Sequence, residues 1–317
     1  MREPVILCVS ANPGMDRRLH IKSMVVGGIN RATSAQGFAG GKAAHVAMAA
    51  HALNAKTKWI AFLGGAIGQE CATQMESLGV DVVSVPTASH TRVNLEIIDG
   101  SGQITEILEP GGEPAAGEAA DFLLKCQKEI ENAGRSAVLA ISGRLPSAVT
   151  PGLYSSLIEA ARAAGIASFV DTSGEALRAS LKAQPRFVKA NRQEAEELIG
   201  EPLRTIQDAV SSAREIIGRG AASAAITLGG EGLIWIESEN GPVWKAQPPP
   251  VTAISTVGCG DATLAGFARA ATQEISGEEA IRLAAACGAA NCSAVAPGRI
   301  EFATVQALLS RIEVQRL

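Results

Sequence analysis

Short apolar runs alternate with helical stretches along most of the chain. The runs 137–142 and 167–171 are rich in Ala, Val and Ile, and the segment between them, 152–165, indicates a helix. The same order of strand, helix and strand returns from 186 to 230. Strands that are apolar on both faces and alternate with helices are typical of a parallel sheet covered on both sides. The pattern therefore predicts an α/β fold with a mostly parallel central sheet.

Two segments break this pattern and predict a second, smaller sheet. Residues 91–113 alternate apolar and polar positions on both sides of the Asp-Gly-Ser-Gly stretch at 99–102, which is a strong hairpin signal. An irregular, glycine-rich segment covers 12–41. A sheet of these pieces is too small to be stable alone, so we expect it to cover the main domain as a lid. We predict a single domain, 1–317, with a lid formed by about 12–41 and 88–112.

Composition and charge narrow the functional class. The chain has 317 residues, 47% of them hydrophobic, which is enough for a large core. A net charge of -4 and an aromatic content of 3% argue against a nucleic-acid-binding protein. No apolar stretch is long enough to span a bilayer, so we expect no membrane partner. Six scattered cysteines favour reduced thiols in the cytoplasm, and four histidines away from any cysteine pair argue against a zinc site.

The stretch STVGCGDATLAGF, residues 255–267, carries the sharpest chemical signal. Gly258 and Gly260 permit unusual backbone conformations and leave the backbone open to a ligand. We expect Asp261 at the N-cap of the helix that follows. A helix N-terminus presents free N–H groups and a positive dipole end, so the stretch predicts an anion site with a carboxylate beside it. A plain capped helix after a loop is the alternative.

A second glycine-rich stretch, 37–42, ends in Gly-Gly-Lys and opens an alanine-rich helix. It is not a Walker A loop, because Gln36 and Ala43 stand where that motif needs Gly and Ser or Thr. The dinucleotide-binding fingerprint is also missing, because Thr263 occupies the place of its third glycine. Taken alone, Gly-Gly-Lys is as compatible with a plain loop-to-helix junction as with a ligand loop.

Further candidates are polar residues at turns. Asn191 and Glu194 are three residues apart at a strand-to-helix turn, where Glu194 would help to place a hydrated Mg²⁺. The alternative is a helix that begins with an acidic first turn, which needs no ligand. Basic residues in loop-like settings suit phosphate recognition, although single ones are commonly solvated surface: Arg31, Lys42, Arg92 and Arg144.

The order of these motifs is more specific than any one of them. Gly-Gly-Lys, the hairpin, ISGRLP, VDTSGEAL, VKANRQE, TLGGEG and VGCGDATLAGF follow one another as in the PfkB group of ribokinase-like carbohydrate kinases. The resemblance runs from about Val5 to Gly298. NPGMD, INR, TRVN and ISGRLP resemble the branch of 1-phosphofructokinases, tagatose-6-phosphate kinases and minor 6-phosphofructokinases. It implies a ribokinase-like three-layer sandwich with a mostly parallel central sheet and a small β lid.

The resemblance also implies a reaction, in which the γ-phosphate of ATP passes to a hydroxyl of a phosphorylated ketohexose. Fructose 1-phosphate, tagatose 6-phosphate and fructose 6-phosphate are the expected acceptors, and Mg²⁺ accompanies ATP. By analogy, Asp261 is the general base that takes the proton of the attacking hydroxyl. The backbone N–H groups of Gly258, Cys259 and Gly260 form an anion hole for the transferring phosphoryl group.

The remaining roles follow from the same resemblance. Asp16 holds sugar hydroxyls near Gly40, Gly41 and Lys42. The phosphate on the substrate is bound by Arg92 and Lys42, with Arg31 and Arg144 as further candidates. The residues implied for ATP are Lys189, Asn191, Thr227, Gly229, Gly232 and, on the adenine side, Asn291, while Glu194 serves Mg²⁺. The lid excludes water and so limits hydrolysis of ATP.

The chain departs from the family pattern at five positions. Ala43 and His45 stand where the family usually carries Gly and Asn, and Ala190 replaces the usual Pro. Cys259 replaces Ala, and Arg144 replaces a residue that is commonly Ser. His45 and Arg144 fall near the expected sugar pocket. These two departures therefore leave the identity of the substrate undecided, but they do not affect the type of reaction that is expected.

Three other functions stay open at this point. A kinase of an unphosphorylated sugar or nucleoside would give the basic residues near the sugar nothing to pair with. A non-catalytic sugar- or nucleotide-binding regulator would not need the carboxylate of Asp261. A dehydrogenase would need the dinucleotide fingerprint that is missing. A homodimer through the lid is an arrangement that the sequence allows but does not decide, because an exposed small sheet tends to be covered.

Overall fold

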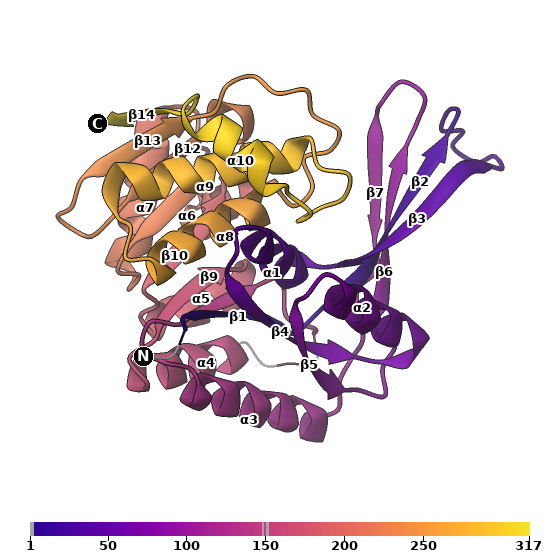
Figure 1. Ribbon diagram of the computed structural model, residues 1–317, viewed down its shortest axis with the longest axis horizontal. Helices are drawn as coiled ribbons and strands as arrows, with labels where there is room; N and C mark the ends of the chain where they lie inside the picture. Colours follow the sequence, from indigo (N-terminus) through magenta and orange to yellow (C-terminus); the bar gives the residue numbers. More distant parts are fainter. Residues whose placement is uncertain (1–2, 148, 150–151) are drawn as a thin grey trace.

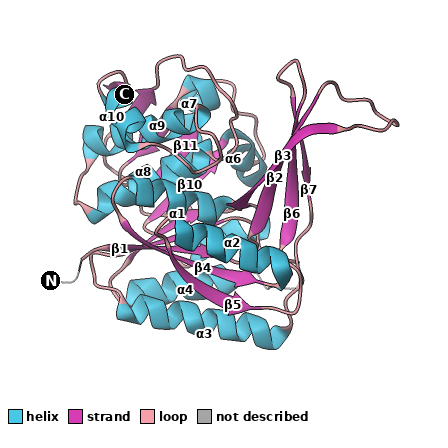
Figure 2. Ribbon diagram, turned by 45° about the vertical axis from the view of Figure 1, so that its right-hand side comes forward, coloured by secondary structure: helices cyan, strands magenta, loops and turns pink. Residues whose placement is uncertain are grey.

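The computed structural model describes residues 3–147, 149 and 152–317. Its largest element is a ten-stranded sheet (Figures 1 and 2). The strands are, in spatial order, β14 (Glu313–Arg316), β13 (Val243–Gln247), β12 (Leu233–Ile236), β11 (Ala224–Thr227), β10 (Phe187–Asn191), β9 (Ala167–Asp171), β8 (Val138–Ser142), β1 (Val5–Ser10), β4 (Lys56–Leu63) and β5 (Asp81–Pro86). Pairing is parallel from β11 to β5 and antiparallel from β11 to β14. The predicted α/β class with a mostly parallel sheet is confirmed.

Helices cover both faces of this sheet. One face packs against α1 (Lys42–Ala52), α2 (Gly65–Ser77), α8 (Cys259–Thr272), α9 (Gly277–Cys292) and α10 (Phe302–Leu309). The other packs against α3 (Ala116–Asn132), α4 (Gly152–Ala163), α5 (Gly174–Lys182), α6 (Arg192–Ile199) and α7 (Ile206–Gly218). Each face has its own buried apolar cluster, and β1 and β8 are buried along their whole length. These strands read as continuous apolar runs because both of their faces are covered.

A four-stranded sheet projects from the body of the molecule (Figure 1). Its order is β3 (Ala32–Gly40), β2 (Gly14–Ile21), β6 (Arg92–Ile98) and β7 (Ile104–Leu108), so it combines the two segments that broke the sequence pattern. One end, where Gly14 pairs with Gly40, lies at the start of α1. At the far end Val26 is 96% exposed and Ile29 80% exposed. We refer to these four strands and their loops as the small sheet.

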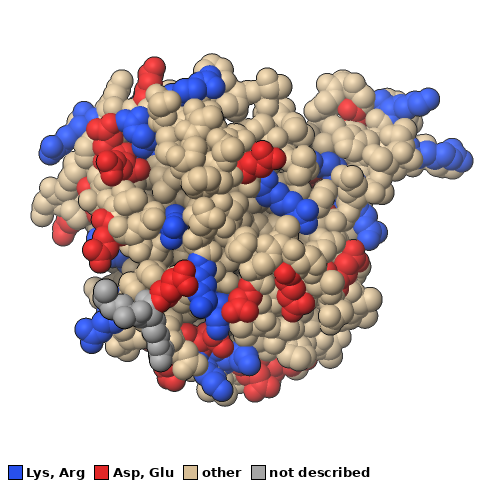
Figure 3. All heavy atoms as spheres, in the orientation of Figure 1, with Lys and Arg blue, Asp and Glu red and all other residues tan. Residues whose placement is uncertain are grey.

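The strand ends and helix starts that face the small sheet carry polar side chains. Asp171, Asn191 and Thr227 end the neighbouring strands β9, β10 and β11. Since ligands of parallel sheets bind beyond the carboxyl ends of strands, this edge is where a site is expected. On the face shown in Figure 3, basic and acidic side chains are interspersed over the body. Among the described helices, none has both the length and the apolar character needed to cross a bilayer.

Candidate active site

The glycine-rich stretch around Asp261 forms the beginning of α8. Gly258 is the N-cap of this helix and has a φ of 81°, in the left-handed region that favours glycine. A side chain there would also press on Pro297 and on Asn291. Asp261 is therefore the third residue of α8, and the prediction that it is the N-cap is wrong. Its carboxylate is buried beside the helix N-terminus, where free N–H groups are available to an anion.

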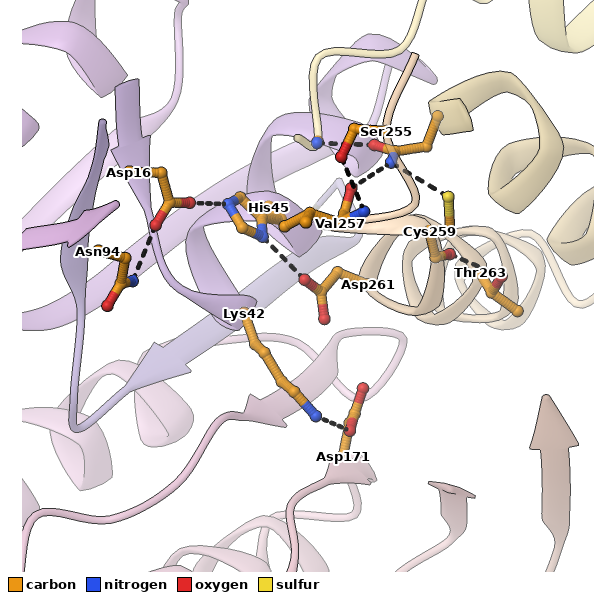
Figure 4. A network of polar contacts seen from close by, with 12 residues as sticks. Asp16, Lys42, His45, Asn94, Asp171, Ser255, Val257, Cys259, Asp261 and Thr263 are labelled. Atoms are coloured by element: carbon orange, nitrogen blue, oxygen red, sulfur yellow. Dashed lines mark hydrogen bonds and ion pairs between the residues drawn. The ribbon is translucent and has the colours of Figure 1, made fainter. Parts of the chain in front are cut away.

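One imidazole ring joins two carboxylates from distant parts of the chain (Figure 4). His45 on α1 places Nε2 2.7 Å from Asp16 Oδ2 on β2 and Nδ1 2.8 Å from Asp261 Oδ2 on α8. Asn94 on β6 donates from Nδ2 to the other oxygen of Asp16 at 2.8 Å. Gly40 is required here, because a Cβ atom at this position would overlap the Asp16 carboxylate. The predicted sugar-binding and base carboxylates thus lie on either side of one ring.

The protonation state of this ring follows from its partners. A neutral imidazole has a single N–H, so it can donate to only one of the two carboxylates. Burial lowers the pKa of His45, but the hydrogen bonds and charges of Asp16 and Asp261 outweigh burial and raise this pKa to about 10. Burial acts to raise the pKa of Asp16, yet His45 and Asn94 together lower it. We therefore describe His45 as an imidazolium between two carboxylates.

A second charged cluster lies below the anion site. Lys42 Nζ is 2.8 Å from Asp171 Oδ1 and 2.8 Å from Glu194 Oε1, and Lys189 Nζ is 2.8 Å from Asp171 Oδ2. Burial opposes ionisation of Asp171, but the two lysines outweigh it and lower the pKa of this carboxyl to about 2. Lys42, which the sequence assigned to a sugar phosphate, is instead held by carboxylates of β9 and α6. Lys189 is almost fully buried, and its Nζ lies under Gly260.

Asn191 and Glu194 form a reciprocal cap at the start of α6. Asn191 Oδ1 accepts from the Glu194 N–H at 2.8 Å, and Glu194 Oε2 accepts from the Asn191 N–H at 2.9 Å. Within the described residues there is no group of three or more His, Cys, Asp or Glu side chains that would enclose a metal ion. Mg²⁺ commonly keeps several waters and takes only one or two carboxylates together with phosphates. Glu194, which is partly exposed beside Lys42, fits such a water-mediated role, whereas Asp171 is fully buried between Lys42 and Lys189 and does not.

Of the residues assigned to the nucleotide, Lys189 is buried within β10 and paired with Asp171. The others lie at adjacent strand ends, with one exception. Asn191 and Thr227 are direct neighbours in the register of β10 and β11, and Gly229 and Gly232 flank the short turn that follows. Asn291 is the exception, and the structure does not support its assignment to adenine. Its Nδ2 donates to the Val257 carbonyl and its Oδ1 accepts from the Gly298 N–H, both at 2.7 Å. Its amide therefore holds the loops behind the anion site.

Arg92 and Arg144 lie close enough for their charges to interact. Arg92 donates to the carbonyls of Glu109 at 2.9 Å and Asn12 at 3.3 Å. Its Nε is buried without a hydrogen-bond partner among the residues described. Burial lowers the pKa of Arg92, and the neighbouring Arg144 charge acts in the same direction, whereas Asp16 opposes them. Two adjacent guanidinium groups suit a dianionic phosphate.

Arg31 is not near these two arginines. It is exposed and precedes β3, whereas Gly40, at the other end of that strand, adjoins Asp16. Nine strand residues span about 30 Å at roughly 3.3 Å each. The structure therefore does not bring Arg31 to the site of its own chain.

A buried ion pair connects the small sheet to the loop that precedes the anion site. Arg18 on β2 lies 2.5 Å from Glu96 on β6, and Arg18 also donates to the Val295 carbonyl at 2.7 Å. Glu96 in turn accepts from Ser255 Oγ at 2.7 Å. Ser255 also accepts from the Val257 N–H at 3.1 Å, immediately before Gly258.

Sequence reasoning left three residues of this site without a role. Asp171 carried a usable signal, because a carboxylate directly follows a buried apolar strand. Asn94 stood in the TRVN motif but was not singled out. His45 was noted only as a departure from the family pattern, and nothing in the sequence indicated its two partners.

A family model described as pfkB family carbohydrate kinase matches residues 17–300. The chain belongs to this family. A 1-phosphofructokinase of Bacillus subtilis is 26% identical over 313 residues, covering 99% of this chain and 100% of that protein. The ATP-dependent 6-phosphofructokinase isozyme 2 of Escherichia coli is 33% identical over 254 residues, covering 79% of this chain and 80% of that protein.

Solved structures agree with this assignment. The tetrameric inhibited form of phosphofructokinase-2 from Escherichia coli matches with a TM-score of 0.88 and 28% identity, covering 98% of this chain and 99% of that one. The comparisons confirm the predicted family, the ribokinase-like fold and the enzyme class, an ATP-dependent sugar-phosphate kinase.

Proposed function

We propose that this kinase transfers the γ-phosphoryl group of ATP to a hydroxyl of a phosphorylated ketohexose. Fructose 1-phosphate, fructose 6-phosphate and tagatose 6-phosphate are the candidate acceptors. The observation that carries the proposal is the buried carboxylate of Asp261 at the N-terminus of α8, with Asp16 held nearby. Relatives named 1-phosphofructokinase and 6-phosphofructokinase support this class of acceptor.

In the proposed mechanism, Asp16 binds sugar hydroxyls and Asp261 takes the proton of the attacking hydroxyl. The N–H groups at 258–260 stabilise the transferring phosphoryl group, and the dipole of α8 favours the negative charge that gathers there. Cys259 contributes less freely, because its N–H already donates to the Thr256 carbonyl at 3.3 Å. Phosphoryl transfer depends mainly on such positioning and charge stabilisation.

Substrate phosphates have separate places in this proposal. Arg92 and Arg144 bind the phosphate already on the sugar, because their two guanidinium charges lie close together. Asn191, Thr227 and the turn 229–232 bind ATP. Glu194 would hold Mg²⁺ through water, and the ion would neutralise part of the phosphate charge. Lys42 pairs with both Glu194 and Asp171 and keeps these carboxylates in position.

The small sheet acts as the lid of this active site. Its near end contributes Asp16, Asn94 and Arg92, so covering the sugar also excludes water from the reacting groups. Its exposed apolar far end favours a homodimer formed through the lid. The phosphofructokinase-2 relative is described as tetrameric in an inhibited form, which fits an oligomeric family. All six cysteines are free thiols, and the proposed location of the enzyme is the cytoplasm.

The test is release of ADP from Mg-ATP with a panel of acceptors. The panel contains fructose 1-phosphate, fructose 6-phosphate, tagatose 6-phosphate, free fructose, ribose and a nucleoside. We expect turnover with phosphorylated ketohexoses only, and turnover at least about 100-fold lower in a matched Asp261→Asn preparation, which controls for contaminating kinases. Turnover confined to a free sugar or nucleoside would contradict the phosphate-binding role of Arg92 and Arg144. No turnover with any acceptor would contradict the proposed substrate class.

A further inference from the structure

His45 has a geometry that the proposed mechanism does not use. Its ring lies between Asp16 and Asp261, with one nitrogen on each carboxylate at 2.7 and 2.8 Å (Figure 4). The two carboxylates come from different elements, β2 and α8, while the ring comes from α1. Both ring nitrogens and the ring itself are buried, so water does not compete for these hydrogen bonds. The contact is therefore a bridge between the sugar end and the base end of one site.

The surroundings of the ring account for its charge. Carboxylates face it directly from β2 and α8, and the Gly298 backbone packs against its Cα and Cβ atoms. Lys42, one turn earlier on α1, interacts electrostatically with Asp261 but is itself held by Asp171 and Glu194. On the side of β6, the charged and polar groups next to Asp16 are Arg92 and Asn94.

We propose that His45 is a positioning residue: as an imidazolium, it ties the sugar-binding carboxylate of Asp16 to the base carboxylate of Asp261. This inference rests on the proposed function. The bridge fixes the separation between the two carboxylates and engages Asp261 through Oδ2, so that Oδ1 is the oxygen we expect to take the proton of the reacting hydroxyl. A cation between two carboxylates also reduces their mutual repulsion, and their repulsion of an anionic substrate.

The bridge has a defined dependence on pH. When the ring loses a proton, one of its nitrogens becomes an acceptor facing a carboxylate, and that hydrogen bond is lost. Because the pKa of His45 is raised in the folded protein, its stabilising contribution is complete below the ordinary pKa of about 6.5. This contribution then declines as the pH rises and is lost above about 10.

The first test observes the ring itself and needs no substrate. In a ¹⁵N spectrum of histidine-labelled protein at pH 8, we expect one signal with both ring nitrogens protonated, which is missing from a His45→Gln variant. The Asp261→Asn variant should shift the titration of this signal to lower pH, because one carboxylate has been neutralised. A His45 ring that is neutral at pH 8 would overturn the proposal, whether or not the enzyme has been given its correct substrate.

The second test separates positioning from mere structural support. We expect His45→Gln and His45→Asn to lower kcat about 10- to 100-fold while KM for ATP changes less than about threefold. The fall of kcat that the native enzyme shows on approaching pH 10 should be absent from both variants. His51→Gln is the matched control on the same helix and should retain that fall. Persistence of the same high-pH limb in the His45 variants would overturn the role.

The two tests also distinguish this inference from the proposed function. A protonated bridge in a protein that phosphorylates none of the panel acceptors would refute the substrate class and leave the bridge standing. A neutral His45 ring in an enzyme that phosphorylates the panel acceptors would refute the bridge and leave the substrate class standing.

A different observation concerns two sulfur atoms at the anion site. Cys259 Sγ and Cys292 Sγ are 3.2 Å apart, at the start of α8 and the end of α9. Both residues are partly exposed, whereas the other four cysteines are buried. A hydrogen bond from Cys259 outweighs the effect of burial and lowers the pKa of Cys292 to about 7. A thiolate of this kind at the surface is a reactive one.

We infer that this pair is a modification site that a peroxide converts into a disulfide. The Cys292 thiolate attacks a peroxide oxygen, the O–O bond breaks, and the first water leaves after protonation, giving a sulfenic acid. The Cys259 sulfur then attacks that sulfur, the S–O bond breaks, and a second water leaves. Two thiols are oxidised and one peroxide is reduced. The sulfurs must close from 3.2 Å to about 2.05 Å, and we expect this shift to displace the N–H groups at 258–260.

The test is exposure of the native protein to hydrogen peroxide, followed by peptide mass analysis and assay. We expect a cross-linked peptide pair containing Cys259 and Cys292, loss of two thiols, and a fall in turnover of more than about 10-fold that dithiothreitol reverses. Cys292→Ser and Cys259→Ala should each retain their own starting activity under the same treatment. Oxidation at other cysteines, or equal loss of activity in these variants, would overturn the inference.

Discussion

The two ends of the active site are built in different ways. At the base end, the proposed anion site consists of backbone atoms of a short stretch, 258–260, and one carboxylate in the first turn of α8. At the sugar end, side chains from β2, β6 and α1 form a network in which Asp16, Asn94 and His45 fix one another. A backbone site constrains only the residues that set its conformation, such as Gly258, and so tolerates the departure at Cys259, whereas a side-chain network can be rebuilt with other residues. His45, which departs from the family pattern, belongs to the side-chain network of the sugar end.

The largest effect is expected at the base end. Asp261→Asn should lower kcat about 10²- to 10⁴-fold, because the amide cannot take the proton of the attacking hydroxyl. Binding of ATP and of the sugar phosphate, measured by calorimetry, should change only a few-fold. Turnover close to that of the native enzyme would exclude Asp261 as the base.

The second prediction concerns the charged cluster of Asp171, Lys42 and Lys189 below the base end, and it is tested through the free energy of unfolding. Lys189→Met should lower the free energy of unfolding by about 3 kcal/mol, because it leaves a fully buried Asp171 with one cation in place of two. Urea denaturation measures the change. Lys58→Met is the matched control: it breaks a more exposed pair with Glu129 and should cost less than about 1 kcal/mol. Equal decreases in the free energy of unfolding in both variants would show that the Asp171 cluster stabilises the fold no more than an exposed ion pair does.

At the sugar end, we expect a substitution to weaken binding of the sugar phosphate but not of ATP. Arg92→Ala should raise KM for the sugar phosphate about 10- to 100-fold and leave KM for ATP within about threefold, because Arg92 lies beside Asp16. Steady-state kinetics with each substrate varied in turn gives both values. If both substrates weaken equally, Arg92 supports the fold of the small sheet rather than a phosphate.

The smallest effect is expected at the far end of the small sheet. Arg31→Ala should change both KM values by less than about twofold, because this residue is exposed and remote from Asp16. A larger change, dependent on enzyme concentration, would mean that Arg31 reaches the site of a partner subunit.

Sequence reasoning predicted the fold well because apolar runs buried on both faces leave a strong local pattern. It also located the stretch 258–261, although it placed the helix start too late. The left-handed backbone of Gly258 allows α8 to begin at Cys259, and no side chain signals that start. Asn291 was misassigned because its two backbone partners, at 257 and 298, are fixed only by tertiary packing.

The sugar end was less predictable for a related reason. His45 is 216 positions away from Asp261 along the chain, and only the folded structure brings them together. Its usual residue in the family, Asn, gives no hint that an imidazole would span two carboxylates. The two ion pairs of Lys42 were likewise not predicted, because Asp171 and Glu194 approach it from separate elements.

The buried pair Arg18–Glu96 has a consequence for engineering this enzyme. Glu96 is shared between Arg18 and Ser255, and Arg18 also holds the Val295 carbonyl, so the strands of the small sheet are matched to loops of the body. A chimera that exchanges only 12–41 and 88–112 for those of a relative would replace Arg18 and Glu96, and it would leave Ser255 and the Val295 carbonyl without these partners. To change acceptor preference by exchanging the small sheet, residues 255–257 and the loop at 295 therefore have to be exchanged together with it.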